Sequence, residues 1–170
     1  MHWSEKLLRD PVGAVLLENF KAPRFIVSPA EFHRADFRPR LAWQSVKFTK
    51  ASHGSIPEEP GLYAFVVRIP FDGLPQHGWV MYIGQTGDGT SSATLRSRYG
   101  QYLRDQRACK RAMVFLMLNL WDGHLEFFFT PQPRRKADLE TMETQLLGAF
   151  RPPFTDRTYP AAFMSPRHAF

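Results

Sequence analysis

Apolar positions recur along this chain with two periods, and the period decides which element each segment is expected to form. Apolar side chains at helical spacing predict helices, whereas short apolar or alternating runs bounded by Gly and Pro predict strands. Residues 43–50 alternate apolar and polar side chains, which is typical of an edge strand. The expected helices span 4–20, 93–104, 107–121 and 137–150, and the expected strands span 61–68, 79–83 and 124–130.

Residues 107–121 are open to two interpretations. Met113, Leu116, Met117 and Leu120 have helical spacing, but Asp122-Gly123 before the next apolar run also resembles a hairpin turn. We favour a helix followed by a strand. Residues 21–42, rich in Pro, Phe and Arg, are expected to be irregular or partly extended. The pattern predicts an α/β (α+β) fold, with a small, mainly antiparallel three-stranded sheet flanked by helices and a helical or irregular N-terminal extension.

Composition narrows the class of protein. A chain of 170 residues with 44% hydrophobic residues can bury one core. Its formal charge of +6 favours polyanionic partners, nucleic acid first, although charge of this size also serves solubility. One cysteine excludes an intrachain disulfide. No run approaches the roughly 20 apolar residues that span a bilayer, so we expect a soluble, cytoplasmic protein with no membrane partner.

Two predicted neighbouring strands each carry a tyrosine, in Gly61-Leu62-Tyr63 and in Tyr82-Ile83-Gly84. Leu95-Arg96-Ser97-Arg98-Tyr99-Gly100-Gln101-Tyr102 follows on a predicted helix, and Glu143-Thr144-Gln145-Leu146-Leu147 lies on another. Phe150, Pro152 and Phe154 follow this last run. In this order the elements resemble the GIY-YIG nuclease family. The resemblance covers residues 57–156 and leaves an N-terminal extension, 1–56, and a C-terminal tail, 157–170.

The resemblance implies a metal-dependent endonuclease that hydrolyses DNA phosphodiester bonds. It implies that Tyr63 acts as or orients the general base, that Tyr82 assists it or binds phosphate, and that Arg98 stabilises the transition state. Tyr102 would lie near the reacting phosphate, and Glu143 would bind a single Mg²⁺ or Mn²⁺. These residue types suit the reaction, since it needs an oriented water, a cation-binding carboxylate and charge stabilisation on phosphate. Substrate contacts are expected from Gly84, Gln85 and Arg96.

The chain departs from the family pattern at three places. Eighteen residues separate Tyr63 from Tyr82, more than the family's usual linker, and the excess lies in the turn-rich segment 70–78. Gln85 follows the second motif where some members have a lysine that lowers a tyrosine pKa, so Arg96 or another cation would have to compensate. Thr155-Asp156 occupies the region where the family often has Asn.

Other chemistry is less well supported. The six histidines show no metal-ligand spacing, and the loop that begins at Gly84 lacks the Gly-Lys-Ser/Thr ending of a phosphate-binding loop. Basic residues at 96–111 and 134–136 suit a DNA backbone, single-stranded or branched forms included. Two alternatives stay open: a catalytically silent nucleic-acid-binding module, and a toxin or phage-defence nuclease. Because the extension is small, targeting would come from it, the 70–78 loop, a protein partner or a homodimer.

Overall fold

A computed structural model describes residues 29–35, 41–70, 73, 75, 77–87, 92–108, 110–132 and 136–155. The helix expected over 4–20 and the tail 157–170 lie outside these residues. In chain order the elements are α3 (Pro29–Arg34), β1 (Gln44–Lys47), the 3-10 helix η1 (Ala51–Ser55), β2 (Gly61–Val67), β3 (Trp79–Thr86), α4 (Leu95–Asp105), α5 (Ala112–Leu120), β4 (Leu125–Pro131) and α6 (Lys136–Phe150).

The sheet has four antiparallel strands in the order β1-β4-β2-β3, so the expected number of three was wrong. The additional strand is β1, which pairs Gln44–Lys47 with β4 and confirms the edge strand expected within 43–50. This pairing is favourable because it hydrogen-bonds the side of β4 that β2 leaves open. The expected antiparallel pairing of β2 with β3 is also confirmed, and it places Tyr63 opposite Gly84.

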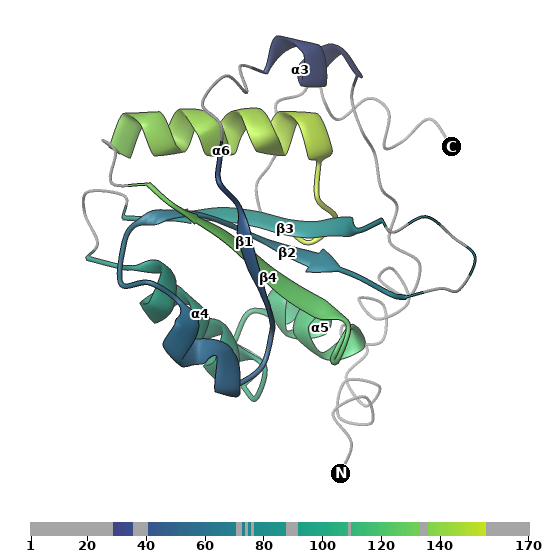
Figure 1. Ribbon diagram of the computed structural model, residues 1–170, viewed down its shortest axis with the longest axis vertical. Coiled ribbons are helices and arrows are strands. Elements are labelled where there is room, and N and C mark those ends of the chain that lie inside the picture. Colours follow the sequence, from purple (N-terminus) through teal and green to yellow (C-terminus); the bar gives the residue numbers. More distant parts are fainter. Residues whose placement is uncertain are drawn as a thin grey trace.

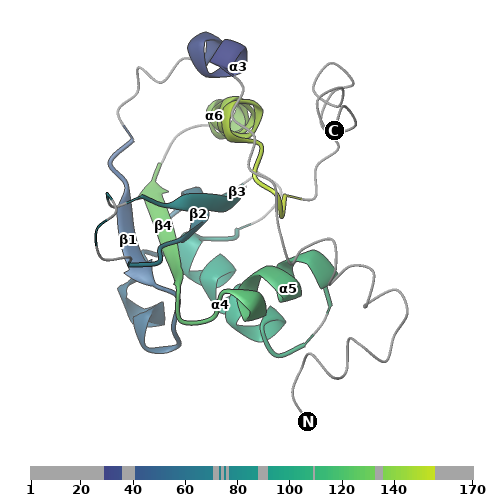
Figure 2. The ribbon, with the colours of Figure 1, turned by 90° about the vertical axis from the view of Figure 1, so that its right-hand side faces the viewer.

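Helices cover both faces of the sheet (Figures 1 and 2). One face is covered by α4 and α5, and the other by α6, with α3 lying over α6. The helical interpretation of 107–121 is confirmed by α5, whereas the irregular structure expected for 21–42 was wrong at α3. Phe32 of this short helix packs edge-on against Phe150, at 6.1 Å between ring centroids, a tertiary contact that the sequence pattern does not reveal.

Alternation along β2 divides the core into two clusters. Tyr63, Phe65 and Val67 point into an aromatic-rich cluster with α4 and α5, whereas the side chains between them pack with Leu139, Leu146 and Leu147 of α6. Every residue of β2 is buried, as expected for a strand covered on both faces. The backbone N–H of Phe154, in the segment after α6, donates to the carbonyl of Met81 at 3.1 Å. The outer edge of β3 is therefore partly covered.

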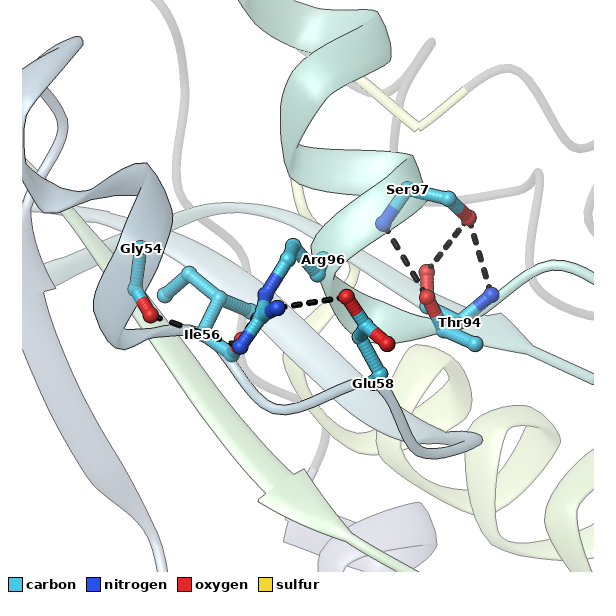
Figure 3. A network of polar contacts seen from close by, with 6 residues as sticks. All are labelled: Gly54, Ile56, Glu58, Thr94, Arg96 and Ser97. Carbon is cyan, nitrogen blue, oxygen red and sulfur yellow. Dashed lines mark hydrogen bonds and ion pairs between the residues drawn. The ribbon is translucent and has the colours of Figure 1, made fainter.

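The start of α4 is anchored by two sets of polar contacts (Figure 3). Thr94 and Ser97 form a reciprocal capping box, which hydrogen-bonds the first N–H groups of the helix. Arg96 donates from Nε to the carbonyl of Ile56 at 2.6 Å and forms an ion pair with Glu58. These contacts fix α4 against the loop that leads into β2, and so set the position of the residues that α4 carries.

The described residues contain no helix that combines the length and the apolar character needed to cross a membrane.

Candidate active site

Three tyrosines from three different elements meet on the α4–α5 face of the sheet. Tyr63 comes from β2, Tyr82 from β3 and Tyr102 from α4, and their ring centroids lie 5.8–6.1 Å apart. The hydroxyls of Tyr63 and Tyr102 are hydrogen-bonded at 2.9 Å. Both of these side chains are buried, whereas Tyr82 is partly exposed. The tyrosines predicted from the two motifs and from α4 therefore form one cluster, with Tyr82 nearest to solvent.

Gly84 makes room for this cluster. A Cβ atom at this position would lie 2.5 Å from the hydroxyl oxygen of Tyr63 and 2.6 Å from its Cζ. A side chain larger than hydrogen would therefore displace the Tyr63 ring, which lies across the strand pair from Gly84. This packing gives a physical reason for glycine here. The substrate contact expected from Gly84 stays a prediction.

Arg98 lies one turn before Tyr102 on α4, on the same side of the helix. Its Nη1 donates to Oε1 of Gln101 at 2.8 Å, which holds the guanidinium in place. Its Nε is buried and makes no hydrogen bond to any of the described residues. The positive charge of Arg98 also favours the ionised form of Tyr63. The structure thus places beside the tyrosines an oriented cation with donor capacity to spare.

Burial controls the protonation of Tyr63 and Tyr102. Desolvation raises the pKa of each well above its ordinary value, and Tyr82 raises both further, whereas the hydrogen bond with Tyr102 lowers the pKa of Tyr63. For Tyr63 the charge of Arg98 acts in the opposite direction but does not outweigh burial. Both hydroxyls are therefore neutral near pH 7. The neutral hydroxyl of Tyr63 is suited to orienting another group by hydrogen bonding, rather than to acting as an ionised tyrosinate base.

A second arginine, which the motif did not indicate, also contacts the cluster. Arg111 precedes α5 and lies with its Cζ 5.0 Å from the centroid of the Tyr102 ring. Its guanidinium is ion-paired with buried Asp105 at the end of α4. The only sequence signal was the basic run 96–111, which does not single out any one of its members. Arg96, the cation that the sequence suggested as compensation for Gln85, instead ties the 54–58 loop to α4.

The remaining predicted residues belong to the other face. Glu143 is buried, with 5% of its surface exposed, on the α6 stripe that includes Leu139 and Leu147. Gln85 pairs with Leu62, so its side chain is also directed to the α6 side of the sheet. The structure therefore unites Tyr63, Tyr82, Tyr102 and Arg98, and carries Glu143 on a helix that packs against β3 from the opposite face.

A divalent cation can be tested against these donors. Among the described residues, no three His, Cys, Asp or Glu side chains converge on a point. Glu143 is the one carboxylate in the predicted site. This donor set does not fit a cage built from protein ligands, but it fits Mg²⁺, which commonly binds one or two carboxylates and fills its shell with water and phosphate oxygens.

The α6 face also carries an apolar groove of about 920 Å³. Phe32, Trp43, Val80 and Phe150 are among the side chains that line it. None of the predicted site residues lines this groove, so the candidate chemistry lies elsewhere on the molecule.

Comparison of the chain with protein-family models, with curated proteins and with solved structures finds no match in any of the three.

Proposed function

We propose that the protein is a divalent-metal-dependent endonuclease that hydrolyses DNA phosphodiester bonds, with a site of the GIY-YIG kind. The observation that supports it best is the convergence of Tyr63, Tyr82 and Tyr102 beside Arg98, whose Nε makes no hydrogen bond to the described residues. Hydroxyls that orient water beside a guanidinium that binds phosphate are the groups that this reaction needs.

Each side chain then has a definite task. Arg98 donates from Nη2 to phosphate oxygens and stabilises the negative charge that grows on them in the transition state. Tyr82, the most accessible of the three tyrosines, holds the attacking water. Tyr63 and Tyr102 keep the cluster in place through their hydroxyl–hydroxyl bond. Water attacks phosphorus and releases one proton to solvent, the bond between phosphorus and the leaving oxygen breaks, and that oxygen takes up one proton from solvent.

Glu143 is the residue proposed to hold the cation. When bound, Mg²⁺ or Mn²⁺ would supply charge neutralisation at the phosphate and assist departure of the leaving oxygen. Exposed Arg104, Arg107 and Lys110, at and beyond the end of α4, extend positive charge away from the tyrosine cluster. These cations suit contact with successive phosphates of a DNA backbone.

Cleavage assays test the proposal directly. Purified protein is incubated with supercoiled plasmid, a single-stranded oligonucleotide and a branched junction, each with Mg²⁺, Mn²⁺ or EDTA. We expect cutting with either metal, none with EDTA, and loss of cutting in Glu143→Gln. Glu140→Gln, an exposed site one turn earlier on α6, is the matched control and should cut normally. Cutting that persists in EDTA, or that is unchanged in Glu143→Gln, would contradict the metal role.

A catalytically silent nucleic-acid-binding module is the second candidate. It is favoured by the deep burial of Tyr63 and Tyr102 and by the position of α6, the helix that carries Glu143, on the opposite face of the sheet. This alternative predicts DNA binding that weakens steeply with salt, without cutting of any substrate in any metal. Gel-shift titrations at several salt concentrations, run beside the cleavage assays, separate the two functions.

A further inference from the structure

Asp105 and Arg111 form an ion pair at the end of α4, and the carboxylate of this pair is buried. Asp105 is 4% exposed and accepts hydrogen bonds at one carboxylate oxygen, Oδ2, from both Nε and Nη2 of Arg111. The Nε bond is 3.1 Å long. Buried ion pairs often gain little over apolar packing, because desolvation offsets their attraction. The contacts that the pair holds in place can therefore indicate why it is present.

The pair holds a cation against the tyrosine cluster. Asp105 and Tyr102 lie three residues apart on the same side of α4, so an arginine bound to Asp105 is brought over the Tyr102 ring. The guanidinium carbon lies 5.0 Å from the ring centroid, within the range of a cation–π contact. The hydroxyl of the same ring lies 2.9 Å from that of Tyr63.

We propose that Arg111, oriented by Asp105, is a positioning residue of the active site: it fixes the Tyr102 ring and favours negative charge on the Tyr63–Tyr102 hydroxyl pair. This inference rests on the proposed nuclease function. The guanidinium acts through Tyr102 and needs no contact with DNA. Any negative charge that develops on these two hydroxyls is stabilised by a fixed cation nearby.

Several charged or titratable groups lie around the two tyrosines, and each affects the expected result. Arg98 on α4 and Tyr82 on β3 act on Tyr63, and Tyr82 and Arg111 act on Tyr102, whereas Asp105 contacts Arg111. From β4, the uncharged side chain of Phe127 stacks against the Tyr63 ring. Because Arg111 and Asp105 have opposite charges, their removal should affect ionisation of the tyrosines in opposite directions. If the Asp105–Arg111 pair had a purely structural role, removal of its two members would not shift the ionisation of the tyrosines in opposite directions.

Fluorine NMR provides a test that does not depend on catalysis. The full chain is labelled with a ring-fluorinated tyrosine of raised acidity, and the resonances of Tyr63 and Tyr102 are assigned through Tyr→Phe variants. We expect Arg111→Gln to raise the ionisation midpoint of the pair by roughly one pH unit and Asp105→Asn to lower it. Arg111→Lys, which keeps the charge, should restore most of the original midpoint. Arg107→Gln, an exposed arginine of the same basic run, is the matched control and should shift little.

The pH dependence of plasmid cleavage by the same fluorinated proteins forms the second arm. Arg111→Gln should move the alkaline limb of the rate profile upward, and Asp105→Asn should move it downward. Midpoints that are unchanged, or that move in the same direction in the two folded variants, would overturn the proposal. If the protein cuts no DNA, opposite NMR shifts still establish the electrostatic role of Arg111. In that case only the proposed nuclease function would be contradicted, so the experiment separates failure of this function from failure of the role proposed for Arg111.

Discussion

The two faces of the sheet use the same strands for different purposes. On the α4–α5 side, β2 contributes Tyr63 and Phe65 to a dense aromatic cluster that contains two hydrogen-bonded hydroxyls and adjoins two arginines. On the α6 side, the alternate residues Ala64 and Val66 meet aliphatic side chains and border an apolar groove. One alternating run of seven residues therefore builds a polar centre on one side and an apolar surface on the other.

The difference shows how a buried polar centre is tolerated. Tyr63 and Tyr102 satisfy each other through their hydroxyls, and Arg111 is neutralised by Asp105, so these polar groups have partners within the cluster. Aromatic rings around them exclude water, which strengthens the effect of nearby charges. The α6 face has no comparable network of tyrosines among the described residues, and Glu143 is the buried acidic group there.

Removal of a core side chain should reveal the largest difference in stability between the two faces of the sheet. Phe65 is fully buried and packs against Tyr102, Phe48 and Phe127, so Phe65→Ala should lower the free energy of unfolding by about 3–5 kcal/mol. Its neighbour Val66 borders the groove, and Val66→Ala should cost about 1–2 kcal/mol. Denaturant unfolding measures both. Equal losses, although a smaller side chain is removed at Val66, would contradict the closer packing expected on the α4–α5 side.

Loss of Arg98 should affect activity far more than folding. Arg98→Ala removes the guanidinium beside the tyrosines and should reduce kcat/KM for plasmid cleavage by roughly 100-fold or more, as expected for a donor at a charged transition state. Arg104→Ala, on the same helix but exposed, is the control and should weaken cleavage only modestly. Thermal unfolding of both variants should stay close to that of the parent. Comparable losses of activity in the two variants would show that Arg98 contributes only to the positive charge of the surface.

The hydroxyl pair should show coupling in a double-mutant cycle. Tyr102→Phe and Tyr63→Phe each leave a buried hydroxyl without its partner, at a cost of about 1 kcal/mol in the free energy of unfolding. The double variant removes both hydroxyls and should be less destabilised than the sum of the two single variants. Denaturant unfolding of the four proteins gives the coupling. Strict additivity would show that the 2.9 Å contact contributes nothing.

The smallest expected effect is the contribution of Tyr63 to the loss of stability at high pH. The pKa of Tyr63 is raised in the folded protein above the ordinary value of 10.0, so above that pH the unfolded chain loses a proton that the folded one keeps. Stability from this group is complete below pH 10.0 and declines as pH rises further. Unfolding measured at increasing alkaline pH should therefore show a gentler decline in Tyr63→Phe. An identical decline would show that Tyr63 is not the group responsible.

Elements with long or strongly apolar patterns were predicted well, and those held by distant contacts were not. The strands at 61–68 and 124–130 and the helices at 93–104 and 137–150 carry their own signal, since burial imposes an apolar pattern on each. By contrast, α3 has six residues and is supported by Phe150, more than a hundred residues later in the chain. A helix this short has too few internal hydrogen bonds to be predicted from its own residues.

The candidate site divides in the same way. Tyr63, Tyr82, Tyr102 and Arg98 were singled out through the resemblance of their motifs to those of GIY-YIG nucleases, and the structure brings them together. The role of Arg111 could not be found in this way. It lies in a connection between two helices, and only its return to Asp105 places it over the tyrosines.

The sequence by itself determined the main strands and helices, the antiparallel pairing of β2 with β3, and the identity of the clustered tyrosines and Arg98. Tertiary structure alone decided which face of the sheet each predicted residue joins. It set α6, the helix that carries Glu143, on the face opposite the tyrosines, used Arg96 to tie a loop, and brought Arg111 to the cluster. The physical reason is that periodic burial leaves a local trace in the order of residues, whereas the partner of a charge depends on chain segments that meet only after folding.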